Sequence, residues 1–177
     1  MNSNHGVAMI ADALAKGLHV DTVKAYDACV KGIFEKTLLP WCKTSACSID
    51  TFYWKHGYIP ALHPGETEHV REVNPNEKRQ PVAVSLGTAY DLWCLSRIAS
   101  KMGKDDDSKK YSELSLNYRK LFNDTTCFFQ PKDKNGNFIE PFDYRFSGGL
   151  GARDAYDENN GWIYRWDVQH NIPNLLS

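Results

Sequence analysis

The sequence lacks several features that would assign the chain to a broad class at once. Its 177 residues contain no uncharged run of about 18 apolar residues, which argues against a membrane-spanning helix. The 21 basic residues form no stripe of the kind that binds nucleic acid. The first residues also lack the basic and then apolar layout of a signal peptide. We therefore expect neither a membrane nor a nucleic acid as a partner, and any export signal would have to lie outside this chain.

Cysteine occurs in an odd number, so at least one of the five residues must be unpaired within the chain. Cys42 and Cys47 are close in sequence, but no second pair completes a zinc-binding pattern. The sequence predicts free, mostly buried thiols and does not decide the redox compartment. With 42% hydrophobic and 24% charged residues, the composition is ordinary for a globular chain.

Apolar residues recur at helical spacing rather than in the alternation typical of strands. Val7, Ile10 and Leu14 share one face of a first predicted helix that stops at Gly17, and Asp21 is typical of the N-cap of a second. The full set of predicted helices covers residues 6–17, 21–37, 82–102, 105–122 and 159–168. The intervening residues 38–81 carry five prolines and are predicted to form mainly a long excursion.

One short β element interrupts the helical pattern. The apolar segments 127–129 and 137–139 flank Asn135-Gly136, and Asn-Gly is a strong signal for a tight hairpin turn. We therefore predict a small β-hairpin between the fourth and fifth helices.

The pattern as a whole predicts an all-α fold. Paired helices joined by elaborated loops are typical of an (α/α)6 toroid, which closes with six helix pairs, so about five helices amount to a piece of a larger domain. Ser147 to Gly151 are predicted to form a flexible loop. Trp162 and Trp166 are four residues apart on the last predicted helix, and we expect both in the core.

Several segments match one known family in a common order along the chain. Ser85-Leu86-Gly87-Thr88-Ala89-Tyr90-Asp91-Leu92-Trp93 lies on the predicted helix 82–102, and Glu158-Asn159-Asn160-Gly161-Trp162-Ile163-Tyr164-Arg165-Trp166 opens the last one. Shorter matches lie around His5, at Gly57-Tyr58-Ile59-Pro60 and around Pro131. Together these segments resemble glycoside hydrolase family 92, the calcium-dependent exo-α-mannosidases. The two longer segments read there Thr-Leu-Glu-Tyr-Ala-Tyr-Asp-Asp-Trp and Glu-Gly-Asn-Ala-Trp-Gln-Tyr-Thr-Trp.

The resemblance exposes one missing group. The Glu of the first family segment is the general acid, and Gly87 stands at that position here, with no proton to give. The carboxylates that activate the attacking water lie, in the family, beyond the end of this chain. The resemblance therefore implies that residues 1–177 are part of one toroid catalytic domain that carries neither member of the acid–base pair.

The resemblance also implies binding residues and partners. The residues that it places at sugar contacts are Asp157, Glu158, His5 and His170. It implies Asn160 as an oxygen ligand of calcium, a site weakened by Ile163 where the family has Gln. It further implies a mannose-containing glycan and the remainder of the catalytic domain as partners, and a periplasmic or extracellular location.

Ordinary structural roles stay open for the same residues. Gly87 is compatible with close helix packing, although a glycine inside a helix costs about 1 kcal/mol relative to alanine. Asp157 and Glu158 could form the acidic first turn of a helix, where negative charge is favourable. His5 and His170 could be capping or core histidines.

Two hypotheses follow for the complete protein. An inverting glycosidase needs an acid on the leaving oxygen and a base on water, with their carboxyl groups roughly 6.5–9.5 Å apart. Loss of the acid costs about 10²–10⁴ in rate for an alkoxide leaving group, whereas phosphate leaves as a stable anion. The first hypothesis is thus an α-mannosidase-like hydrolase of α-mannosides or of activated or phosphate-linked mannose. The alternative is a non-catalytic carbohydrate-binding or structural remnant of the fold.

Overall fold

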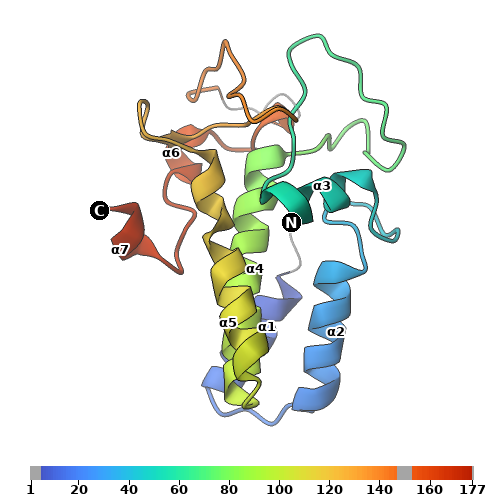
Figure 1. Ribbon diagram of the computed structural model, residues 1–177, viewed down its shortest axis with the longest axis vertical. Coiled ribbons are helices and arrows are strands. Elements are labelled where there is room, and N and C mark those ends of the chain that lie inside the picture. Colours follow the sequence, from blue (N-terminus) through green and yellow to red (C-terminus); the bar gives the residue numbers. More distant parts are fainter. Residues whose placement is uncertain (1–4, 147–152, 177) are drawn as a thin grey trace.

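The computed structural model describes residues 5–146 and 153–176, and over these ranges the chain is mostly helical (Figure 1). The described α-helices are α1 (Gly6–Ala15), α2 (Thr22–Phe34), α3 (Ser48–His56), α4 (Pro81–Lys101), α5 (Asp105–Leu114), α6 (Gly161–Tyr164) and α7 (Ile172–Leu175). Together with one small antiparallel sheet, they confirm the predicted fold class. None of the described helices is both long and apolar enough to cross a membrane. The predicted loop from Ser147 to Gly151 lies outside the described residues.

The first two helices form the predicted pair and run in opposite directions (Figure 1). Asp21 caps α2 as expected, because its side chain accepts the backbone N–H of Lys24 at 3.2 Å. Tyr26, Cys29 and Ile33 recur at helical spacing and are buried. The pattern of apolar residues therefore predicted the helix and part of the face that it buries, but Val23, at the same spacing, is 71% exposed.

The segment 38–81, predicted mainly as a loop, contains the additional helix α3. Asp50 fixes its start, since one carboxylate oxygen accepts the N–H of Cys47 and the other accepts the N–H of Leu38, both at 2.7 Å. Gly57 ends the helix in the left-handed conformation, at a φ of 85°. These two signals, an acidic residue in the first turn and a glycine after the last, were present in the sequence.

Helix α4 lies at the centre of the molecule and packs against α1, α2 and α5 (Figure 1). Fifteen of its 21 residues are buried, so it is covered on nearly all sides. Pro81 occupies its first position, where a missing N–H costs no helical hydrogen bond. The prediction of a helix over residues 82–102 is confirmed.

The fourth predicted helix changes type near its end. α5 begins with Asp105, Asp106 and Asp107, whose charges suit the positive end of the helix dipole. After Leu114 the chain continues as a 3-10 helix, η1 (Ser115–Leu121), which also packs against α4. Residues 105–121 are thus helical as predicted, but the last seven residues form a 3-10 helix instead of an α-helix.

The small sheet differs in position from the predicted hairpin. Strand β1 (Phe122–Asn123) pairs with β2 (Phe128–Phe129), whereas residues 137–139 form only an isolated bridge between Phe138 and Lys132. The Asn135-Gly136 turn does form, with Gly136 at a φ of 91°. Asp133 organises it by accepting the backbone N–H groups of Asn135 and Asn137. Because side-chain bonds satisfy the turn and Pro131 has no N–H to donate, the ladder does not extend there.

The last predicted helix, 159–168, was too long. Only α6 and, further on, α7 are helical in this region. Trp162 and Trp166, expected in the core, are each 50% exposed, and Ile163 is 60% exposed. Most helical stability comes from packing of an apolar face. With these three side chains at least half exposed, residues 162–166 bury no complete apolar face, and the helix is short.

Candidate functional site

The first feature of the site is position 87 on α4. Gly87 lies in the second turn of this helix and is partly exposed, whereas Leu86 and Thr88 on either side are buried. The turn is tied to the loop after α3, because the backbone N–H of Ile59 donates to Ser85 Oγ at 3.0 Å. The backbone at position 87 is therefore well anchored, but the position carries no group that could give or take a proton.

One helical turn beyond Gly87, Asp91 forms an ion pair with His5. His5 directly precedes α1, and its Nδ1 lies 3.4 Å from Oδ1 of the nearly fully buried Asp91. The hydrogen bond to Asp91 raises the pKa of His5, and the charges of Asp91 and Asp167 act in the same direction. Burial raises the pKa of Asp167 as well. The start of α1, the middle of α4 and the segment after α6 thus bring one histidine and two carboxyl groups together.

Asp157 and Glu158, the predicted sugar contacts, lie around the guanidinium of Arg153. Asp157 Oδ1 is 3.5 Å from Arg153 Nε, and Glu158 Oε1 is 3.3 Å from Arg153 Nη2. Their exposure differs sharply, at 16% for the Asp157 side chain and 65% for that of Glu158. Neither residue is part of a helix, so an acidic first turn does not account for them. Their contact with sugar stays a prediction.

Asn160, the predicted calcium ligand, caps α6. Its Oδ1 accepts the N–H of Trp162 at 3.1 Å, and its Nδ2 donates to the carbonyl of Arg145 at 3.4 Å. Over residues 5–146 and 153–176, no group of three or more His, Cys, Asp or Glu side chains could hold a metal ion. An amide oxygen suits calcium as one of about six to eight oxygen ligands. Calcium binding through Asn160 stays a prediction.

His170 lies in an aromatic cluster. Its ring is 6.0 Å from that of Tyr90, 6.2 Å from that of Trp93 and 5.6 Å from that of Tyr118, measured between centroids. Its Nε2 is 3.3 Å from the carbonyl oxygen of Ser115, and burial lowers its pKa. These contacts favour the structural role that the sequence left open, and sugar contact by His170 stays a prediction.

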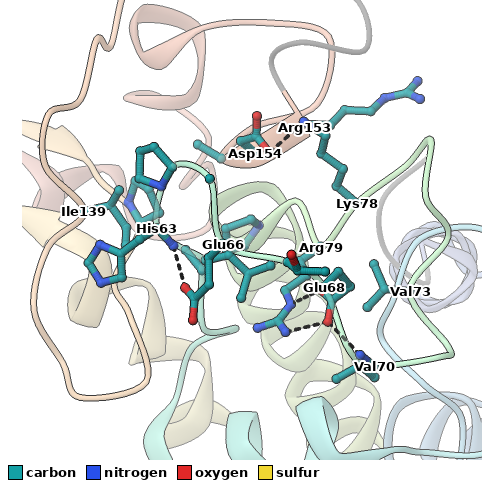
Figure 2. Close-up of a pocket in the computed structure, with 18 of the residues that line it drawn as sticks. His63, Glu66, Glu68, Val70, Val73, Lys78, Arg79, Ile139, Arg153 and Asp154 are labelled. Carbon is teal, nitrogen blue, oxygen red and sulfur yellow. Dashed lines mark hydrogen bonds and ion pairs between the residues drawn. The ribbon is translucent and has the colours of Figure 1, made fainter.

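A pocket of about 830 Å³ opens between the loop before α4 and the segment that leads to α6 (Figure 2). Glu68 and Arg79 line it as a two-pronged ion pair, with N–O distances of 2.5 and 2.8 Å. Burial acts to raise the pKa of Glu68, but the hydrogen bonds from Arg79 and the backbone outweigh it, so the pKa is lowered. Lys78 and Asp154 form a more exposed pair, 2.7 Å apart, at the rim.

The pocket and the predicted site residues meet at one side chain. Arg153 lines the pocket and also contacts Asp157 and Glu158, whereas Gly87 and Tyr58 are not among the lining residues. Tyr58 is buried and its hydroxyl donates to the carbonyl of Asp133 at 2.9 Å. The predicted binding residues therefore lie in four places: His5 at Asp91, Asp157 and Glu158 at Arg153, His170 in its aromatic cluster, and Asn160 at the start of α6.

Sequence analysis missed Arg153, Glu77 and the pair Glu68–Arg79. Each lies outside the matched segments. Arg153 and Glu77 are 76 positions apart, whereas Glu68 and Arg79 are 11 positions apart within one loop. The one available signal was the density of charged residues in a segment otherwise rich in proline, between 61 and 81. Such a signal cannot say which charges pair.

Comparison with known proteins identifies the class as a glycoside hydrolase catalytic domain. The family model of the glycosyl hydrolase family 92 catalytic domain matches residues 1–177. The chain belongs to this family. A search of curated proteins gave no match.

Solved structures agree with this assignment. The inverting family GH92 mannosidase BT2199 from Bacteroides thetaiotaomicron is 28% identical, with a TM-score of 0.76 over 99% of this chain. The family GH92 α-mannosidase BT3965 of the same organism, alone and in complex with mannoimidazole, is 22% identical, with TM-scores of 0.76 and 0.78 over 99% of this chain. At that identity BT3965 supports the fold alone. The chain spans only 20–21% of the length of these proteins.

Proposed function

We propose that the complete protein is an α-mannosidase-like hydrolase that favours activated or phosphate-linked mannose over sugars with alkoxide leaving groups. Membership of the family supports the hydrolase, and the likeness to BT2199, an inverting mannosidase, supports mannose as the sugar. The preference rests on Gly87 on α4, which the sequence resemblance matches to the position of the family's general acid.

The chemistry follows from the missing carboxyl group. A sugar alkoxide must be protonated as the glycosidic bond breaks, and loss of that proton transfer costs about 10²–10⁴ in rate. A phosphate or an aryl oxide leaves as a stabilised anion and needs no donor. Asp91, the carboxylate one turn away from Gly87, is engaged by His5. The base that activates water is supplied, on this proposal, by the remainder of the catalytic domain.

The remaining expected features belong to the same proposal. Asp157, Glu158, His5 and His170 contact a mannose-containing glycan, and the protein acts in the periplasm or outside the cell. The protein binds calcium, with the Asn160 side chain as one oxygen ligand and the others from beyond the described residues. The remainder of the domain closes the helical toroid.

The test compares two substrates of the complete wild-type protein. We expect kcat/KM for mannosyl phosphate or a nitrophenyl α-mannoside to exceed that for an unactivated mannobiose by at least about 100-fold. Rapid cleavage of mannobiose would mean that another residue supplies the proton and would overturn the proposal. Mannose binding without cleavage of any of these substrates would instead favour the alternative, a non-catalytic carbohydrate-binding remnant.

A further inference from the structure

Arg153 makes an unusual set of contacts for a single buried side chain. Its Nη1 lies 2.9 Å from Oε1 of Glu77 and donates to the carbonyl of Asn76 at 3.2 Å. Its Nη2 and Nε face Glu158 and Asp157 at 3.3 and 3.5 Å. The Arg153 side chain is only 10% exposed. The planar guanidinium presents its N–H groups in a fixed fork, which directs the hydrogen bonds to Asn76 and Glu158, whereas Asp157 is attracted by charge without a hydrogen bond to Nε.

The charges around Arg153 do not balance. Three carboxylates, those of Glu77, Asp157 and Glu158, surround one guanidinium. Like charges this close to one another repel, and the repulsion grows as water is excluded. Arg153 is therefore the group that allows the two predicted sugar contacts to stay side by side. A simple structural salt bridge would need only one of the three acids.

Glu158 has the features of a side chain held for a ligand. Its φ of 60° lies in the left-handed region, which residues other than glycine rarely adopt and which occurs more often at binding sites. Its side chain is 65% exposed although one carboxylate oxygen contacts Arg153. The carboxylate is thus tethered at one oxygen and still accessible from solvent.

Arg153 also connects this pair to the helix that carries Gly87. Glu77 belongs to the loop that leads directly into α4, and the N–H of Val82 in the first turn of α4 donates to the carbonyl of Ala155 at 2.9 Å. Arg153 and Ala155 therefore join the segment before α6 to the start of α4 through two neighbouring contacts. A displacement of Arg153 would move Asp157 and Glu158 relative to α4.

From these contacts we propose that Arg153 is a positioning residue for sugar binding, which holds Asp157 and Glu158 in place and couples them to the loop at Glu77. It acts through the two carboxylates. The inference rests on the proposed function, because it requires that Glu158 contacts mannose.

The experiment measures mannose binding to the complete protein by calorimetry, with thermal unfolding of each variant alongside. The variants are Glu158→Ala, Arg153→Gln, Arg153→Lys and the double change of Glu158→Ala with Arg153→Gln. Arg145→Gln is the matched control, since Arg145 forms an ion pair with Asp143 but is 73% exposed. We expect Glu158→Ala and Arg153→Gln each to weaken binding about tenfold, as for loss of one hydrogen bond to a charged group.

The double variant is the decisive one. If Arg153 acts through Glu158, the double variant binds about as weakly as either single variant, whereas independent roles would multiply the losses to about 100-fold. Arg153→Lys keeps the charge without the fork and should lie between wild type and Arg153→Gln. Arg145→Gln should bind like wild type.

Three outcomes would overturn the proposal. The first is an Arg153→Gln protein that has a lower melting temperature but binds mannose as tightly as wild type, which would make Arg153 purely structural. If Arg153→Gln does not fold, unchanged mannose binding by Arg153→Lys leads to the same conclusion. The second is a double variant whose loss of mannose affinity is the product of the losses of the two single variants. The third is unchanged binding by Glu158→Ala. The proposed function is tested separately by the wild-type protein. Cleavage of activated mannosides by the wild type would show that the proposed function survives, whereas a wild type that neither cleaves them nor binds mannose would show that the proposed function is wrong.

Discussion

At the scale of single residues, several charges that are partly removed from water are paired with a charge of opposite sign. Glu68 binds Arg79 within the loop that lines the pocket, and Asp91 on α4 binds His5 before α1. Buried charges are costly unless they are paired and hydrogen-bonded. Each ion pair of this kind holds its charged side chains in place and so restricts the movement of the loops that carry them.

His5 allows a prediction about pH. Its pKa is raised in the folded protein, chiefly by the hydrogen bond to Asp91. A raised folded-state pKa contributes stability that is fully present below the unfolded value of about 6.5 and is lost as pH rises through the folded value. His5→Gln should therefore lower the melting temperature of the complete protein more at about pH 5.5 than at about pH 8.5.

The effect should be a few degrees at most, because His5 is half-buried and solvent screens the pair. His19→Gln, at an exposed position, is the control and should show no such pH dependence. A deficit that is equal at both pH values, or larger at high pH, would show that the ion pair with Asp91 does not stabilise the fold.

At the scale of elements, the sequence predicted best where a helix buries a complete apolar face within this chain. α4 was placed to within a residue at each end, and Asp21 was identified as the cap of α2. α3 was missed because the prolines around it favoured a loop, although Asp50 and Gly57 mark its ends. The strand pairing was misplaced because the side chain of Asp133, rather than a backbone ladder, organises the Asn135-Gly136 turn.

The candidate site was predictable only in part, because a sequence pattern reports local structure and not contacts between separate segments. Short motifs identified Gly87, Glu158 and Asn160 as residues of interest, because local sequence patterns carry them. Arg153 and Glu77 were not identified, because their importance comes from a contact between segments 76 positions apart. Spacing along a chain cannot report such a contact.

Helix α6 provides a test of calcium binding. Asn160 has two candidate roles, as the cap of α6 and as a metal ligand, and substitutions can separate them. Serine also caps helices well, but its shorter side chain would not place an oxygen where the amide oxygen lies. In the complete protein, Asn160→Ser should keep the melting temperature measured without calcium near that of wild type and weaken calcium binding about tenfold or more.

Calorimetric titration with calcium measures this directly, and Asn159→Ser is a neighbouring control. Calcium affinity that is the same in wild type and Asn160→Ser would leave Asn160 with the capping role alone. A wild-type protein that does not bind calcium would contradict the cofactor proposal altogether.

At the scale of the whole molecule, the chain is a segment of a larger catalytic domain. It spans about a fifth of the length of the mannosidases that it resembles. Apolar side chains that are at least half exposed are Met9, Leu18, Val23, Trp41, Phe146, Trp162, Ile163, Trp166 and Leu176.

The central claim is that Gly87 removes the general acid, and the most direct test restores it. Gly87→Glu should raise kcat/KM of the complete protein for an unactivated mannobiose by at least about tenfold and leave that for a nitrophenyl α-mannoside within a few-fold of wild type. Gly87→Gln is the matched control, because it has the same size but no proton to give. The account predicts a gain for Glu that Gln does not share and that is confined to the alkoxide substrate. Equal effects of Glu and Gln, or a folded Gly87→Glu protein with no gain on mannobiose, would contradict it.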